Sequence, residues 1–63
     1  MNDEIIFHVN ASGELHNEMG PAVIHPDGYQ AWYQNGIRHR DGGPAIVYPE
    51  MNLEVHYVNG VKQ

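Results

Sequence analysis

The stretch HNEMGPAVIHPDGYQAWYQNG (residues 16–36) returns 23 positions later as HRDGGPAIVYPEMNLEVHYVNG (residues 39–60). The copies share His, Gly-Pro-Ala, two β-branched residues, Pro, an acidic residue, Tyr and Asn-Gly, and the second has one extra residue after its proline. A degenerate unit at residues 5–16 precedes them, and its residues 7–10 resemble residues 32–35 in sequence. A period of about 23 residues suits one β-hairpin per unit rather than a helix pair. We therefore expect a single β-hairpin-repeat domain over residues 1–63.

Turn signals punctuate both copies. Asn35-Gly36 and Asn59-Gly60 follow β-rich runs, and Asn-Gly is the strongest short hairpin signal because both residues tolerate positive φ. Pro26-Asp27-Gly28 predicts a further turn. The runs between these turns are rich in strand-forming residues, at 22–25, 29–34, 45–48 and 53–58. The sequence predicts an all-β fold, an antiparallel meander of about five to seven short strands built from repeated β-hairpins.

Alternation within the strands predicts which side chains share a face. Apolar and polar residues alternate at 53–58, which places one set of side chains together: Leu53, Val55 and Tyr57, and in the first copy Tyr29, Ala31 and Tyr33. Trp32 then belongs to the other face. A two-residue loop at Asp27-Gly28 would pair Ile24 with Ala31 and Val23 with Trp32.

A second apolar face follows from this register. It would gather Val23, Trp32, Ile37 and Ile46, and a single sheet with two apolar faces needs a cover for one of them. Two alternatives remain open for Trp32. It is either a core residue under a curled sheet or an interface anchor, a role in which tryptophan is enriched.

Charge is unevenly distributed along the chain. The formal net charge is −5, and all the acidic residues up to Asp27 precede the first basic residue, Arg38. An acidic surface disfavours contact with nucleic-acid phosphates and favours a basic protein surface, although it also serves solubility alone. The chain has no cysteine, no basic apolar leader and no apolar run of the roughly 18 residues that span a membrane. We expect a soluble cytoplasmic protein that binds neither nucleic acid nor membrane.

No residue pattern indicates catalysis. Ser12 is the only serine and has no paired base, and there is no cysteine nucleophile. Asp27 and Glu50 both occupy turn positions, where an acid is locally useful. No glycine pattern resembles a phosphate-binding loop. We expect a protein that is not an enzyme and needs no cofactor.

The chain holds five histidines, His8, His16, His25, His39 and His56. No two of them have the close spacing of a preformed metal site, although stacked repeats could bring His16 and His39 together. The alternative is that each histidine sits beside its hairpin, where it holds a backbone carbonyl or packs on a ring. A histidine metal site therefore ranks third among the functional hypotheses.

The repeat resembles the MORN-type repeat variants of bacterial and bacteriophage proteins, among them the YwqK-type antitoxins. The likeness rests on Gly20-Pro21-Ala22, Asp27-Gly28, Trp32-Tyr33 and Asn35-Gly36, and in the second copy on Gly43-Pro44-Ala45, Tyr57 and Asn59-Gly60. The second copy departs from it at Glu50-Met51 and His56. The resemblance implies β-hairpin repeats used as a protein-binding scaffold. More loosely, the short acidic chain resembles phage-encoded inhibitors of host defence proteins.

These observations favour a non-catalytic protein-binding module in a bacterial host. It would act as a phage-encoded inhibitor, of the anti-CRISPR or another anti-defence type, or as an antitoxin-like factor, by occupying a basic surface of a larger host protein. The expected partner-binding residues are aromatic anchors and steering acids, namely Trp32, Tyr29, Tyr48, Tyr57, Glu14, Glu18 and Asp27. The alternative is a structural repeat module that self-associates, for example as a homodimer, with no separate target.

Overall fold

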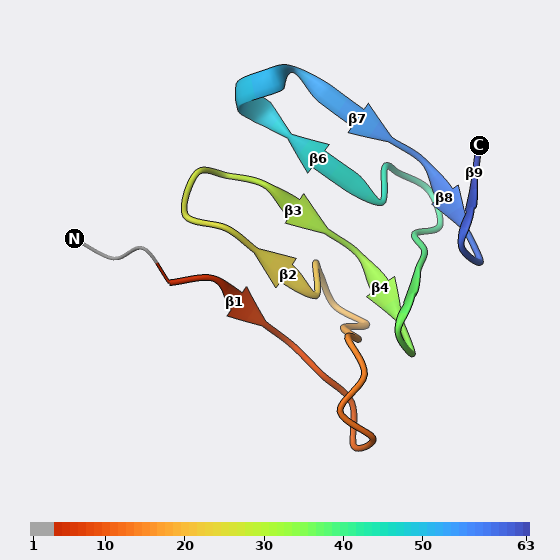
Figure 1. Ribbon diagram of the computed structural model, residues 1–63. Coiled ribbons are helices and arrows are strands. Elements are labelled where there is room, and N and C mark those ends of the chain that lie inside the picture. The colour runs from red at the N-terminus through yellow and green to blue at the C-terminus, as the bar shows by residue number, and fades with distance from the viewer. Residues whose placement is uncertain (1–3) are drawn as a thin grey trace.

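The chain forms a thin sheet of short antiparallel strands (Figure 1). The computed structural model describes residues 4–63. Its strands are β1 (Ile6–Phe7), β2 (Val23–Ile24), β3 (Gln30–Ala31), β4 (Tyr33–Gln34), β5 (Ile37–Arg38), β6 (Ile46–Tyr48), β7 (Leu53–Val55), β8 (Tyr57–Val58) and β9 (Val61–Lys62). A 3₁₀ turn, Pro49–Met51, joins β6 to β7. No helix within residues 4–63 is long and apolar enough to cross a membrane.

The strands follow one another as a meander. Five of them form one sheet in the order β1-β2-β3-β6-β7, and the pairs β4-β5 and β8-β9 extend it as hairpins. A single residue, Trp32, separates β3 from β4, and His56 separates β7 from β8. If β3–β4 and β7–β8 are each counted as one interrupted strand, the nine strands become seven. The predicted all-β antiparallel meander is confirmed.

Hydrogen bonds repeat from unit to unit and define equivalent positions. In each unit, the amide of the residue after a hairpin donates to the carbonyl of the residue before that hairpin. The amide of His16 donates to His8, that of His39 to Trp32, and that of Gln63 to His56. His8 therefore occupies the place of Trp32, and the expected match of Phe7 with Trp32 is wrong by one residue. The first hairpin turn is longer, because five residues separate the bridged pair Val9 and Leu15 and only four separate the pair Tyr33 and Arg38.

The expected register between β2 and β3 is also wrong by one residue. Val23 pairs with Ala31, and Ile24 pairs with Gln30. The loop has three residues rather than two, because Gly28, at φ 99°, donates its amide to the carbonyl of His25. Ala31 also pairs with Ile46, so Val23 and Ile46 share its face and do not join Trp32.

Asn52 replaces glycine in the longer turn of the second copy. It adopts φ 52°, a left-handed conformation that asparagine tolerates better than most residues. Asn35 and Asn59 adopt the same φ ahead of Gly36 and Gly60, as both Asn-Gly turns require. The extra residue predicted for the second copy therefore lies in this turn.

The sheet encloses little. The buried apolar residues are small, namely Ala22, Val23, Ala31 and Ala45. The thinnest dimension of the molecule is 16 Å, which leaves room for one β layer with its side chains. Most large side chains on both faces are therefore half-buried or exposed, which makes them available for contacts with another molecule.

Candidate protein-binding groove

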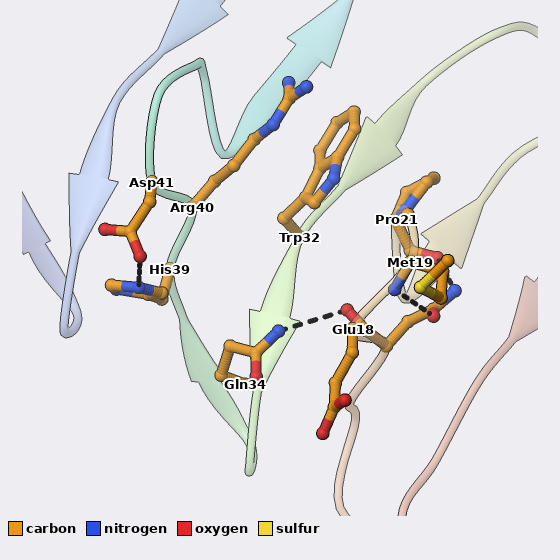
Figure 2. Close-up of a pocket in the computed structure, with 10 residues that line it drawn as sticks. Glu18, Met19, Pro21, Trp32, Gln34, His39, Arg40 and Asp41 are labelled. Carbon is orange, nitrogen blue, oxygen red and sulfur yellow. Dashed lines mark hydrogen bonds and ion pairs between the residues drawn. The ribbon is translucent and has the colours of Figure 1, made fainter.

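An open groove of about 670 Å³ lies between two equivalent loops of consecutive units (Figure 2). We call residues 16–22 the first loop and residues 39–45 the second loop. Residues 17–21 line one wall of the groove and residues 39–41 line the other, with Trp32 and Gln34 between them. Both central residues project from the β3–β4 run, so the floor of the groove is sheet and its walls are loops.

A histidine at the start of each loop joins it to the hairpin of the next unit. Nδ1 of His16 accepts the amide of Asn35 at 3.0 Å, and Nδ1 of His39 accepts the amide of Asn59 at 2.8 Å. The neutral ring then carries its proton on Nε2. These histidines sit beside a hairpin, as expected, but they hold a backbone amide rather than a carbonyl. Both loops are thereby fixed relative to the Asn-Gly turns.

Trp32 is half-buried and stacked against a cation. The guanidinium carbon of Arg40 lies 4.0 Å from the centroid of the indole, within cation–π range. Nη1 of Arg40 also donates to the carbonyl of Pro44 at 3.1 Å, which holds the guanidinium in place. Figure 2 shows the indole between Arg40 and Pro21. Trp32 is therefore covered on one side within the chain while it also lines the groove.

The first loop is held by a similar bond. Asn17, the residue after the loop's histidine, donates from its amide Nδ2 to the carbonyl of Pro21 at 3.0 Å. Gln34 in turn donates to the carbonyl of Asn17 at 3.1 Å. These contacts fix the wall opposite Arg40, so the groove is formed before any ligand binds.

Carboxylates stand on both rims. Glu18 lies 3.4 Å from Nε2 of His16, and Asp41 lies 3.4 Å from Nε2 of His39. The two acidic side chains are 78% and 88% exposed, so each retains acceptor capacity for an external donor. Met19 on the first loop is 94% exposed. The rims therefore combine negative charge with apolar surface.

Three other residues predicted to bind a partner form a separate cluster at the opposite end of the strands. Tyr48 donates its hydroxyl to Asp27 at 3.0 Å, and the Tyr29 and Tyr48 rings meet edge to face at 5.5 Å. The amide of Tyr29, and secondarily the Tyr48 hydroxyl, lower the pKa of Asp27, whereas the same bond to Asp27 raises the pKa of Tyr48. This carboxylate is already engaged, which makes it a turn-stabilising group.

The last two predicted residues lie near the Asn-Gly turns. Tyr57 packs under the guanidinium of Arg38, whose carbon lies 4.8 Å from the ring centroid. Glu14 accepts from the side chain of Asn10 at 3.2 Å in the first hairpin. Of the seven predicted residues, the groove brings together only Trp32 and Glu18.

The sequence analysis missed Met19, Arg40 and Asp41 as groove residues. All three stand where the two loops differ: Met19 against Gly42, Arg40 against Asn17, and Asp41 against Glu18. The signal was available in the variable positions of the H-x-x-x-G-P-A pattern. It was hard to interpret without knowing that consecutive loops face one another.

Comparisons with known proteins do not test the resemblance to MORN-type repeat variants. No protein-family model matches the chain, and no curated protein or solved structure is significantly similar to it. In the part of the chain that the structure describes, no three His, Asp or Glu side chains gather in a way that could hold a metal ion. The site is therefore characterised by its own geometry, which is that of a preformed groove with an aromatic floor and acidic rims.

Proposed function

We propose that this protein is a non-catalytic binding module whose groove takes a basic segment of a larger protein. The observation that carries the proposal is Trp32, a half-buried tryptophan on the floor of an open groove whose two rims bear the exposed carboxylates of Glu18 and Asp41. Tryptophan is among the residues most enriched at the energetic centres of protein interfaces.

The chemistry of the groove suits a lysine or arginine side chain of the partner. Its aliphatic stem would lie along Trp32 and Met19, which are apolar, while its charged head would reach the carboxylate of Glu18 or Asp41. The net charge of −5 would draw such a partner by long-range attraction. Both loops are held by internal hydrogen bonds, so little ordering would accompany binding.

In its biological setting the protein would act by occupation. A bound module would block a basic surface of a host protein from its normal ligand, as an inhibitor of a bacterial defence protein or an antitoxin-like factor would. The MORN-type resemblance, with its protein-binding scaffolds, supports this setting. The acidic character of the chain supports the choice of a basic target.

Site-directed photocrosslinking in bacterial lysate tests the proposal. The photoreactive residue p-benzoylphenylalanine replaces Met19 in the groove or, as a matched control, Val61, which is 63% exposed on β9. We expect a discrete crosslinked protein from position 19 only. Its yield should fall at least about tenfold with Trp32→Ala, a loss of about 1.4 kcal/mol in binding free energy.

Salt provides the second arm of this test. At about 0.5 M NaCl the Debye length is only about 4 Å, so capture through exposed carboxylates should weaken strongly. Equal crosslinking from positions 19 and 61, or capture that ignores both salt and Trp32→Ala, would contradict the proposal.

A further inference from the structure

The imidazoles of His16 and His39 each have two contacts, which belong to different parts of the molecule. On one side, Nδ1 accepts an amide from the hairpin of the next unit, that of Asn35 at 3.0 Å or that of Asn59 at 2.8 Å. On the other side, Nε2 faces a carboxylate of the histidine's own loop at 3.4 Å, as Figure 2 shows for His39 and Asp41. Each ring therefore lies between a hairpin and its own loop.

Only the neutral ring can keep the contact with the hairpin. To accept an amide, Nδ1 needs its lone pair, so the proton of the neutral ring lies on Nε2. Imidazole is the side chain whose protonation ordinarily falls between about pH 5 and pH 8. The added proton would lie on Nδ1 and point at the amide hydrogen, so the bond to the hairpin would be lost. The carboxylate on the other side attracts the charged ring more strongly than the neutral one.

We propose that pH regulates the groove through His16 and His39. While neutral, the two rings hold the hairpin amides and leave the carboxylates of Glu18 and Asp41 to a partner. When protonated, they release the hairpins and pair with those carboxylates instead. The backbone amides of His16 and His39 donate to carbonyls at 2.9 and 3.1 Å, and these bonds hold the start of each loop whether the rings are charged or neutral. The fold should therefore persist while the contacts exchange.

The other charged groups near the two rings are already engaged. Glu14 packs beside the first Asn-Gly turn and accepts from the side chain of Asn10 at 3.2 Å. Arg38 and Arg40 flank His39 in the sequence, and both guanidiniums pack on aromatic rings. The hairpins themselves present asparagine and glycine, which carry no charge. The carboxylates on the rims of the groove are therefore the groups that a charged ring would meet at Nε2.

Protonation would weaken the binding of a cationic partner in two ways. Each charged imidazole would compete with the lysine or arginine of the partner for the carboxylate beside it, Glu18 or Asp41. The added positive charges would also reduce the long-range attraction between an acidic module and a basic surface. This consequence for binding rests on the proposed function, whereas the exchange of contacts does not.

Nuclear magnetic resonance of the ¹⁵N-labelled protein tests the exchange of contacts. We expect both rings to carry their proton on Nε2 at about pH 7.5 and to be doubly protonated at about pH 5. Over this range the protection of the Asn35 and Asn59 amides against hydrogen exchange should fall about 3- to 10-fold, because each loses one hydrogen bond. The amide of Trp32, which donates to the carbonyl of Ala45 at 2.7 Å, is the reference and should keep its protection.

The matched control is a double variant, His16→Asn with His39→Asn. The amide oxygen of asparagine can accept a hydrogen bond as Nδ1 does, but it takes up no proton in this range. Protection of the two hairpin amides should then be the same at both pH values. The proposal is overturned if the rings of the parent protein protonate without loss of protection, or stay neutral at about pH 5. Equal loss at the Trp32 amide, or in the asparagine variant, would also overturn it.

Photocrosslinking from position 19 tests the consequence for binding. The yield from the parent protein should fall at least about tenfold between about pH 7.5 and about pH 5, and it should fall much less in the asparagine variant. Titration of the partner itself would affect both proteins equally. Equal yields at the two pH values in the parent protein would refute the regulation. A missing crosslink at both would contradict the proposed function, and the exchange of contacts is then decided by the resonance measurement alone.

Discussion

The first and second loops begin with histidine, end with Gly-Pro-Ala and occupy the same place in consecutive units, yet they present different surfaces to the groove. Their shared histidines accept equivalent amides, at 3.0 and 2.8 Å. Their unshared residues supply the exposed Met19 and the stacked Arg40. Repetition therefore maintains the sheet, while divergence between the copies forms the candidate binding surface.

The residue after each loop histidine can both hold its loop in place and contribute to the binding surface. Asn17 and Arg40 each donate to the carbonyl of the proline at the far end of the loop. Arginine can make that bond and still cover the Trp32 ring, because its side chain is longer. The second loop therefore keeps the structural bond and adds the cation–π contact.

The largest expected effect tests whether the shared positions are equivalent. Ala22 and Ala45 are both fully buried, so Ala22→Leu and Ala45→Leu should each overpack the sheet and lower the free energy of unfolding by about 1–3 kcal/mol. Thermal unfolding followed by circular dichroism should show a fall of roughly 4–8 °C for each kcal/mol. Ala11→Leu, at an exposed turn, is the matched control. A large loss at one alanine alone would break the equivalence of the loops.

Substitution of His16 or His39, the histidines that join each loop to the hairpin of the next unit, should have the next largest effect on the free energy of unfolding. His16→Ala or His39→Ala leaves the amide of Asn35 or Asn59 without its acceptor, at a cost of about 0.5–1.5 kcal/mol each. Urea unfolding at pH 7 measures it. The exposed His56 provides a control, because His56→Ala should change little. If only one of the two junction variants is destabilised, the histidines do not share a structural role.

The sequence predicted the repeat, the Asn-Gly turns and the all-β meander because these depend on local backbone preferences. Asparagine and glycine tolerate positive φ at either copy regardless of the surroundings. The register was missed because a three-residue loop that closes on Gly28 cannot be told from a two-residue loop by composition. One added residue reverses the faces of the strand that follows. Val23 and Ile46 were misplaced for that reason.

The candidate site was harder to predict than the fold. Trp32 and Glu18 were identified from residue type, but the groove depends on two loops that lie 23 positions apart in the chain. Arg40 was missed because its contact with Trp32 crosses a hairpin. The prediction grouped three residues with Trp32 because of their residue types: Tyr29, Tyr48 and Asp27. In the structure they cluster at the opposite end of the strands from the groove.

A glycine substitution should sharpen the difference between the loops. A methyl group on Gly43 would lie 2.9 Å from the guanidinium carbon of Arg40, while one on Gly20 meets nothing closer than 3.8 Å. We expect Gly43→Ala to displace Arg40 from the indole and to lose about 0.5–1 kcal/mol of cation–π energy. Gly20→Ala should be neutral or slightly stabilising.

Fluorescence of the single tryptophan reports this displacement directly. Acrylamide should quench Trp32 more readily in Gly43→Ala, and quenching should be unchanged in Gly20→Ala. Equal quenching in the two variants would mean that Arg40 does not shield the ring.

The smallest effect concerns the turns, where the two copies also differ. Asp27 accepts from the Tyr29 amide and the Tyr48 hydroxyl, which lower its pKa, whereas the second copy has Glu50 at the matching position. A lowered folded-state pKa means that the contribution of Asp27 is present above the unfolded value of about 3.9 and is lost as pH falls through the folded value. Asp27→Asn should therefore lower the urea midpoint slightly at pH 6, and the gap to the parent protein should close below about pH 4. Glu50→Gln, at the matching position of the second copy, is the control and should change the urea midpoint little at either pH. A gap for Asp27→Asn that widens in acid would show that this carboxylate does not stabilise the first turn in its charged form.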